Sequence, residues 1–545
     1  MEPSGLFTSI ASKLPVLQSA ACVLAGLLFV FYLLRPILSP LRSIPGPFLA
    51  RYTDAWFLWR VHRGHLEQDF VALHRKYESP GAIVRYGPNR YSFKDLEAPK
   101  IIYGHGHSFI KSSFYRPFAR PGQENWSMFS VDDPKIHSQL RRHYQSTYSL
   151  TSLVSYEPHV DECARLFKQR LEEIAVGGLP IDFAHWLQCY AFDVIGLITY
   201  GSRFGFLDRG EDVKGIISAV GTLLQDGVHV GVYPTFHVPT SRLRGWLSGK
   251  NSGAAYVVAF TQQHIDQFRA SSKTATQEVE KEDDGKVETF LEKYLRKHES
   301  DPTNFTHAHI FNGCSANVVA GSDTTGISLA AIFYYLLKRP DCYQKLREEA
   351  DAVQPSPSKE FTFQEAQAMP YLQAVIKEAL RIHPAFGLPL ERVVPQGGAT
   401  IAGRFFPASV RIPALLSTYT IMSIHIFHYF TANSLTQDSV SVHCWVENRN
   451  ELIFEDPDEF RPERWLTTDT EKLTLMNRHS IPFGLGTRTC IGRHISMLEI
   501  SKLVPRIVRD WDFHLQERAD QMWETENITF VKPQNFMVTV AARGR

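Results

Sequence analysis

One short run near the C-terminus constrains this chain more than any other part of it. A single cysteine, Cys490, lies in a glycine-punctuated loop, with Phe483 before it and an apolar, helix-forming stretch, His494 to Val508, after it. Glycine permits positive φ angles and a close approach of the backbone to a flat ligand. Loop amides and the positive end of the following helix can hold the sulfur as a thiolate. The pattern predicts that Cys490 is the thiolate ligand of a flat metal cofactor and that Arg488 pairs with a cofactor carboxylate.

A lone cysteine is more often a small buried hydrophobe, but the complete run around Cys490 argues against that interpretation. Three further motifs occur in the chain, and together with the loop they are identified as those of the cytochrome P-450 haem-thiolate monooxygenases. They are Ala320-Gly-Ser-Asp-Thr-Thr325, Glu378-x-x-Arg381 and Phe460-Arg-Pro-Glu-Arg-Trp465. The resemblance covers residues 40–545. It implies a mainly α fold with a smaller β-rich region and haem b, ligated by Cys490, between the two.

The resemblance also implies which side chains contact the haem. A buried haem carries two propionates that need cationic partners. Arg488, Arg392 and the segment His137-x-x-x-Arg141 are the candidates, together with Phe483 from the loop. The family often has tryptophan where His137 stands, and Arg142 could replace Arg141. For each arginine the alternative is a solvated surface charge.

The Glu378 and Arg381 side chains lie three residues apart and share one face of the helix that the pattern predicts. Alone, such a pair is usually a weak surface ion pair. The resemblance adds Arg464, which gives a Glu–Arg–Arg network with a structural role before the cysteine loop. Its loss would leave two cations unpaired.

Asp323 and Thr324 are the predicted catalytic pair. They lie within a long helical pattern, Thr306 to Arg339, whose middle contains Gly, Ser and Thr residues that weaken the helical hydrogen-bond ladder. A hydroxyl near the iron can hold an ordered water, and a carboxylate behind it can relay protons from solvent. The alternative is that Thr324 only bonds back to its own helix.

Composition excludes several other classes of protein. The chain has 545 residues, 44% hydrophobic and 21% charged, which is ordinary for a globular protein. Its formal net charge of +1 gives no overall attraction to nucleic acid, so no nucleic-acid partner is expected. Seven scattered cysteines without a C-x-x-C pair favour a reducing compartment over a disulfide framework or a zinc site.

The N-terminal region predicts a membrane anchor. Leu14 to Leu34 is uncharged, apolar and long enough to cross a bilayer. Basic residues that follow it place the remainder of the chain in the cytosol. We therefore expect a single-pass anchor over residues 1–38 in the endoplasmic reticulum membrane, a Pro-rich linker over 39–50 and a catalytic domain over 51–545. The alternative for the apolar run is a buried core helix.

Elsewhere the spacing of apolar residues is mainly helical between residues 130 and 390. Strand character is concentrated in Ala82–Phe93 and Leu388–Phe406, and the polar stretch Ser271 to Glu288 predicts a mobile surface loop. The segment over 409–438 does not fit the family, because Ile412 to Gln437 contains no Asp, Glu, Lys or Arg. We interpret it as a translated intron or other gene-model error. A real surface insertion is the alternative.

These features predict a microsomal monooxygenase that inserts one atom of O2 into a small apolar or amphipathic organic substrate. No G-x-G-x-x-G fingerprint or flavin domain is present, so electrons are expected from a separate NADPH-cytochrome P-450 reductase. Two segments, Leu388-Pro-Leu-Glu-Arg392 and Ile401-Ala-Gly-Arg-Phe-Phe-Pro407, resemble those of filamentous-fungal, pisatin-demethylase-like enzymes of secondary metabolism. The alternatives are a haem-thiolate isomerase or dehydratase, a non-catalytic haem-binding protein, and an inactive product of a mis-spliced gene.

Overall fold

The computed structural model describes residues 36–77, 82–106, 109–123, 127–248, 253–278, 287–354, 360–408, 438–516 and 523–544, together with Gly26, Val30 and Leu34. The predicted anchor, Leu14 to Leu34, therefore lies almost entirely outside the described residues. The same holds for the segment over 409–437.

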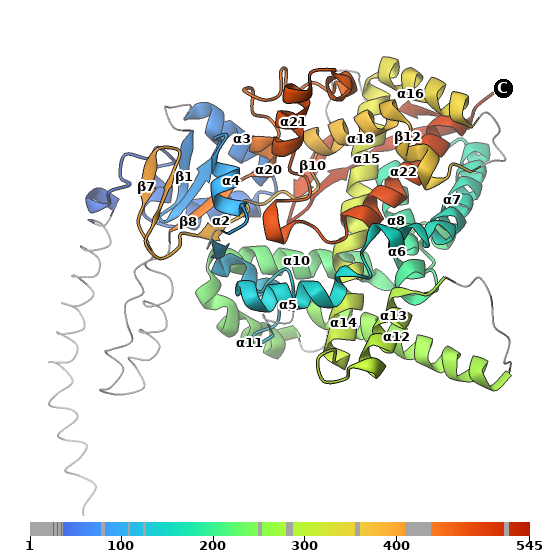
Figure 1. Cartoon of the computed structure of the whole chain (residues 1–545), viewed down its shortest axis with the longest axis horizontal. Coiled ribbons are helices and arrows are strands. Elements are labelled where there is room, and N and C mark those ends of the chain that lie inside the picture. The colour runs from blue at the N-terminus through green and yellow to red at the C-terminus, as the bar shows by residue number, and fades with distance from the viewer. Residues whose placement is uncertain are drawn as a thin grey trace, which may run out of the picture.

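Helices form most of the molecule, as the helical spacing of apolar residues predicts. Figure 1 shows them packed as one body beside a smaller β-rich region. The α-helices are α2 (Ala55–His62), α3 (Leu66–Lys76), α4 (Ala98–Tyr103), α5 (Pro134–Gln145), α6 (Leu150–Val154), α7 (Glu157–Gly177), α8 (Phe183–Tyr200), α9 (Phe206–Arg209), α10 (Ile216–Val232), α11 (His237–Ser248), α12 (Gly253–Glu278), α13 (Phe290–Ser300), α14 (His307–Ala316), α15 (Ser322–Lys338), α16 (Pro340–Val353), α17 (Phe363–Gln367), α18 (Pro370–Ile382), α20 (Cys444–Glu447), α21 (Thr470–His479) and α22 (Arg493–Asp510). Short 3-10 turns are η1 (Leu49–Arg51), η2 (Ser113–Phe118), η4 (Val213–Gly215), η5 (Pro234–Phe236), η8 (Pro462–Leu466) and η9 (Gly486–Arg488).

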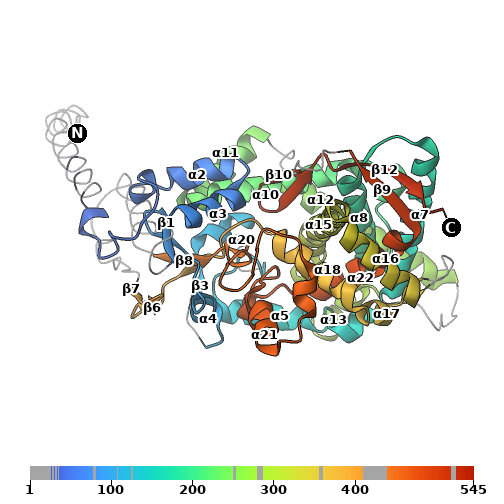
Figure 2. The ribbon, with the colours of Figure 1, turned by 90° about the horizontal axis from the view of Figure 1, so that it is seen from above.

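The β-rich region is built around a five-stranded sheet with the order β1-β2-β8-β5-β3. Its strands are β1 (Ile83–Gly87), β2 (Arg90–Phe93), β3 (Ile110–Lys111), β5 (Arg392–Val393) and β8 (Ser439–Val442), and β6 (Ala399–Ile401) and β7 (Arg404–Phe406) form a separate hairpin. Seen from above in Figure 2, this region lies at one end of the molecule together with α2, α3 and α4, and most of the helices lie toward the other end. The remaining strands, β4 (Ile181–Asp182), β9 (Trp511–Leu515), β10 (Glu524–Asn527), β11 (Val531–Gln534) and β12 (Met537–Ala542), make two small sheets. Both stretches with predicted strand character therefore contain strands.

One long helical passage crosses the helical body, in the range that the sequence predicts. It runs through α14, a five-residue π-helical segment η7 (Asn317–Gly321), and α15, which ends at Lys338 before Pro340 (Figure 1). The π-helical turn ends at Gly321, so it overlaps the predicted weak stretch only at Ala320 and Gly321, and such turns are frequent at functional sites. The Ser and Thr residues that follow lie in regular α-helix.

The polar stretch Ser271 to Glu288 departs in part from the predicted loop, because α12 continues to Glu278 before the described residues stop. Ala, Gln and Glu residues favour helix by intrinsic propensity. Polar composition therefore does not exclude regular structure here.

The residues on either side of the segment over 409–437 both contact the same strand, β2. On one side, the Phe406 ring packs 5.2 Å from the Tyr91 ring and 5.3 Å from the Phe93 ring on β2. On the other side, β8 pairs in parallel with β2, with Val440 opposite Tyr91. Both flanks of the segment therefore lie against β2.

Among the described residues, length and composition single out one helix that could cross a membrane, Val213–Val232, and half of it is buried inside the protein. It packs against η2 and α12, as a core helix does.

Candidate haem-binding site

The cysteine loop has the backbone geometry that its glycines suggest. Gly484 and Gly486 both adopt positive φ, at 71° and 63°. A Cβ on Gly486 would stand 1.9 Å from the Tyr103 carbonyl oxygen, so only glycine fits there. The Cys490 amide donates to the Phe483 carbonyl at 2.9 Å, which closes the loop just before α22.

The Cys490 side chain is accessible although protein surrounds it. It is the exposed cysteine among the six in the described residues, yet burial raises the pKa of its thiol. Three groups lower that pKa and partly offset the effect of burial: the backbone amides of Gly492 and Arg493, at the start of α22, and the charge of Arg141. The Cys490 sulfur is therefore accessible to a ligand, and amide donors are already directed at it.

The predicted cations converge beside this loop. Arg141 donates to the Thr489 carbonyl at 2.8 Å, whereas its neighbour Arg142 is exposed. Arg488 donates to the Val131 carbonyl at 2.8 Å, and burial together with nearby Arg392 lowers its pKa to about 10. The structure therefore places Arg141, and not Arg142, against the cysteine loop.

His137 and Arg392 complete the predicted set. Arg392 is 5% exposed and stacks on the Tyr103 ring at 5.0 Å. His137 is also buried, and burial with the charges of Arg488 and Arg141 lowers its pKa to about 3. A neutral imidazole among three arginines can donate one hydrogen bond without adding to their repulsion.

Lys111 belongs to the same cluster, and the sequence motifs do not reveal it. It is 7% exposed, and burial together with Arg392 and Arg488 lowers its pKa well below the ordinary value. The only hint in the sequence is an isolated lysine among apolar and aromatic residues in Phe109-Ile-Lys-Ser-Ser-Phe-Tyr115.

The predicted catalytic pair occupies two different faces of α15. The Thr324 hydroxyl donates to the Ala320 carbonyl at 2.8 Å. Ala316, Ala320 and Thr324 recur every four residues and are more accessible than most of the helix around them, so they form one accessible stripe. The back-bond orients the hydroxyl and leaves its oxygen lone pairs able to accept from a water.

Asp323 points away from that stripe and is 1% exposed. Its carboxylate forms an ion pair with Lys532 on β11 at 2.8 Å and accepts a hydrogen bond from Gln188 on α8. The Lys532 side chain is 24% exposed, so it connects the buried carboxylate to solvent. The sequence did not indicate Lys532 or Gln188.

One hydrogen bond joins this helix to α22, the helix after the cysteine loop, and the charge of Cys490 also acts on a tyrosine bonded to η7. The Thr325 hydroxyl lies 2.9 Å from the Ser496 hydroxyl on α22. Tyr148, whose hydroxyl donates to the Asn317 side chain in η7, has its pKa raised by burial, to which the charge of Cys490 adds. The helix that carries the predicted catalytic pair is therefore packed against the helix that follows the cysteine loop.

Glu378, Arg381 and Arg464 form one buried network. Arg381 makes two hydrogen bonds to the Glu378 carboxylate, at 2.8 and 2.9 Å, and Arg464 adds a third at 3.0 Å. Trp465 donates to the same carboxylate at 2.9 Å. Burial would raise the pKa of Glu378, but the bonds and charges of Arg381 and Arg464 outweigh it and hold that pKa below the usual value.

These residues fit haem. The donor set combines a thiol with amides directed at its sulfur, a stripe of small residues on the opposite helix, and a cluster of buried cations. A flat apolar ring that carries two carboxylates matches all three features.

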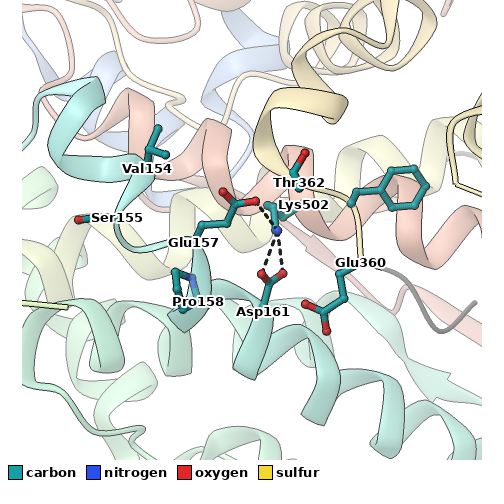
Figure 3. A pocket seen from close by; sticks show the side chains of 9 residues that line it. Val154, Ser155, Glu157, Pro158, Asp161, Glu360, Thr362 and Lys502 are labelled. Carbon is teal, nitrogen blue, oxygen red and sulfur yellow. Dashed lines mark hydrogen bonds and ion pairs between the residues drawn. The ribbon is translucent and has the colours of Figure 1, made fainter. Parts of the chain in front are cut away.

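A separate cavity of about 490 Å³ lies on another face, between α6–α7 and α17–α22 (Figure 3). There the Lys502 ammonium is held by Glu157 at 2.6 Å and by Asp161 at 2.8 Å. Burial raises the pKa of Asp161 to about 6 in spite of that contact. Its lining includes none of the predicted site residues, so we assign it no part in the chemistry.

Comparison with known proteins supports the same conclusion. The sequence profile of the family described as Cytochrome P-450 matches residues 46–421 and 436–540, and its break falls within the anomalous segment. A pisatin demethylase of Fusarium vanettenii is 35% identical over 536 residues, which covers 97% of each chain. A cytochrome P-450 monooxygenase of Aspergillus terreus is 37% identical over 500 residues, covering 89% of this chain and 92% of that protein.

The fold and the site together define a haem-thiolate oxygenase. The chain belongs to the cytochrome P-450 family, and it is a cytochrome P-450 monooxygenase. Proteins of this family bind haem b through a cysteine thiolate.

Proposed function

We propose that this protein inserts one oxygen atom from O2 into a small apolar organic substrate, with Cys490 as the axial thiolate, in fungal secondary metabolism. When bound, haem supplies oxygen activation, which a thiolate ligand favours over reversible oxygen binding. Arg488, Arg392, Arg141 and His137 would hold its carboxylates, with Phe483 packed in the loop. The names of the fungal relatives support the metabolic setting.

The observation that carries the proposal is the arrangement of Thr324 and Asp323. Thr324 presents a hydroxyl, fixed by the Ala320 carbonyl, on the accessible stripe of the helix. Asp323 is held behind it by Lys532, which reaches solvent. Protons can pass from solvent to the carboxylate and then, through water ordered by the hydroxyl, to the reacting oxygen.

This arrangement favours a monooxygenase over a haem-thiolate isomerase or dehydratase. An isomerase rearranges a peroxide substrate and needs no external protons or electrons, so a solvent-linked carboxylate would serve no purpose in it. A non-catalytic haem-binding role would not account for Asp323 and Thr324 either, because binding haem needs no proton relay.

The electrons are expected from NADPH-cytochrome P-450 reductase, because the oxygenase reaction needs an external electron donor and the family profile matches residues 46–421 and 436–540. We place both proteins at the endoplasmic reticulum membrane, this one through Leu14 to Leu34. Membrane sedimentation of a protein without residues 1–38 tests the anchor, since the truncated protein should be released at high salt.

The segment over 409–438 is proposed to be absent from the functional protein. The return of both its flanks to β2 supports this, as does the break in the family profile. Sequencing of the spliced transcript tests it, and most reads containing codons for Ile412 to Gln437 would refute it.

The test of the function is turnover under 18O2 with NADPH and reductase, against a panel of apolar aromatic and terpenoid compounds. A monooxygenase places one 18O atom in the product. Thr324→Ala should divert NADPH to hydrogen peroxide, since loss of a proton-transfer group costs about 10²–10⁴-fold in the step it serves. Thr324→Ser should retain coupling.

Thr474→Ala is the matched control, because the Thr474 hydroxyl makes the same backbone bond, to Thr470 at 2.7 Å, on an exposed helix. Rearrangement of a hydroperoxide without NADPH, at equal rates in the parent and in Thr324→Ala, would establish an isomerase instead.

A further inference from the structure

We propose that Ser496 is a positioning residue for the predicted catalytic pair. Through its bond to Thr325 it fixes where the neighbouring Thr324 hydroxyl lies relative to Cys490. The inference rests on the proposed function and adds a residue outside the four motifs. It is carried by one contact between the hydroxyls of α15 and α22 and by the surroundings of that contact.

Thr325 differs from the other hydroxyl-bearing residues of α15 in its partner. The hydroxyls of Ser322, Thr324 and Ser328 each donate to the carbonyl four residues earlier, at 3.2, 2.8 and 2.8 Å. The Thr325 hydroxyl instead lies 2.9 Å from that of Ser496 on α22, so one of the two donates and the other accepts. A helical Ser or Thr can satisfy its hydroxyl within its own helix, so a bond to another helix adds a constraint between the two.

Ser496 belongs to the turn that holds the cysteine sulfur. Its amide donates to the Gly492 carbonyl at 3.3 Å, in the first turn of α22. The amides of Gly492 and Arg493, in the same turn, are directed at the Cys490 sulfur. One helical turn therefore bonds to the sulfur through its amides and to Thr325 through the Ser496 hydroxyl.

Another flank of α15 is fixed by close packing on α8. A Cβ on Gly326 would stand 2.9 Å from the Gln188 Cα, so the two helices approach closely there. The Gln188 side chain also donates to Asp323. The bond between Thr325 and Ser496 adds the corresponding constraint toward α22.

Thr324 and Thr325 are consecutive, and an α-helix turns by about 100° between consecutive residues. A slide or rotation of α15 against α22 therefore moves the Thr324 hydroxyl with it. Thr325 is 1% exposed, so its hydroxyl is costly to leave unpaired. Misplacing a reacting group by about 1 Å can cost about 10²-fold in rate, so the position of Thr324 matters for proton delivery.

The plain alternative is that the two hydroxyls only satisfy each other in a buried interface. That role would affect the stability of the protein and leave proton delivery unchanged. A test must therefore measure both.

The experiment compares the holoenzyme with Thr325→Val, Ser496→Ala, the double variant and the conservative variant Ser496→Thr. Ser501→Ala is the matched control, because Ser501 is a buried serine on the same helix whose hydroxyl accepts from Gln367 at 3.2 Å. Two quantities are measured: the ratio of hydrogen peroxide to water formed from O2 with NADPH and reductase, and the C–O stretching band of the reduced carbon monoxide complex. Thermal unfolding of the same samples reports stability.

Hydrogen peroxide takes two electrons and two protons per O2, and water takes four of each, so the ratio reports how well protons are delivered. Thr325→Val and Ser496→Ala should each raise it about 2- to 10-fold, as expected for one lost hydrogen bond between neutral groups. The double variant should show no more than either single one, because all three lose the same bond. The C–O band should broaden in these variants, return to its parent width in Ser496→Thr, and be unchanged in Ser501→Ala.

A ratio and a C–O band equal to those of the parent in Ser496→Ala would overturn the inference, even if that variant unfolds at a lower temperature. Effects of the two single variants that add in the double variant would overturn it as well, since they would have separate causes. The proposed function has its own signature, the thiolate-type carbon monoxide band of the parent. A parent without that band refutes the proposed function and this inference with it. A parent with the band and an unaffected Ser496→Ala refutes this inference alone.

Discussion

Two buried clusters of charge in this protein use the same residue types and serve different ends. Around Glu378, one carboxylate meets two arginines, a tryptophan N–H and the Arg461 amide at 3.0 Å. Beside the cysteine loop, the buried cations Arg392 and Lys111 and the partly buried Arg488 make no ion pair with a carboxylate of the described residues. Asp132 and Asp133 act on Arg488 only from beyond ion-pair distance, by raising its pKa.

The difference lies in where the counter-charge comes from. In the Glu378 network the protein provides it, so the arginines there fasten the segment before the cysteine loop to α18. In the cysteine-loop cluster a ligand must provide it, since uncompensated buried charges are costly. A buried arginine that is paired with a carboxylate therefore belongs to the fold class, because it stabilises the fold. A buried arginine without a paired carboxylate belongs to the ligand class, because a bound anion must neutralise it.

The largest expected effect is on the Glu378 network. Glu378→Gln keeps the shape of the side chain but leaves Arg381 and Arg464 buried without a counter-charge. We expect a loss of about 3–5 kcal/mol in the free energy of unfolding, measured by urea denaturation. Glu455→Gln, which removes an exposed partner of Arg461, should leave the free energy of unfolding almost unchanged, because an exposed ion pair is screened by solvent. Equal losses of unfolding free energy in Glu378→Gln and Glu455→Gln would contradict the structural role of the buried network.

Arg392→Met tests the other cluster. Because it removes a cation that has no protein carboxylate, the stability of the polypeptide should change little. Haem should instead transfer to apomyoglobin on the order of 10- to 100-fold faster. Arg296→Met, at an exposed arginine paired with Glu288, is the control and should behave as the parent. Destabilisation of the chain as severe as that of Glu378→Gln would show that Arg392 belongs to the fold class.

The smallest effect is a difference in pH dependence. The pKa of Glu378 is held below its ordinary value of 4.5, so its contribution to stability is complete above that value. The contribution is lost as the pH falls through the lower pKa of the folded state. The stability gap between the parent and Glu378→Gln should therefore be constant from neutral pH to about 4.5 and narrow below it.

The difference in the free energy of unfolding between the parent and Arg392→Met should not change with pH over the same range, because a guanidinium does not titrate there. A gap for Glu378→Gln that widens on acidification would contradict the direction of the Glu378 shift.

The sequence predicts features whose partners are close in the chain or whose chemistry has a fixed spacing. The cysteine loop, the Glu378–Arg381 pair and the helix from Thr306 are of this kind. Lys111 was missed because its neighbour Arg392 comes from a strand far along the chain, and only the β3–β5 register brings them together. Lys532 was missed for the same reason, since β11 meets Asp323 only in the folded protein. The polar stretch after Ser271 was misjudged in part because polar composition does not prevent helix formation.

The central claim is that Cys490 provides a thiolate to haem within this site. Its most direct test is the difference spectrum of the reduced protein with carbon monoxide, recorded for the parent, Cys490→Ala and, as a control, Cys444→Ala at another free cysteine. The red-shifted Soret band of thiolate-ligated haem should be present in the parent and in Cys444→Ala and absent from Cys490→Ala. A band that persists in Cys490→Ala would contradict the claim.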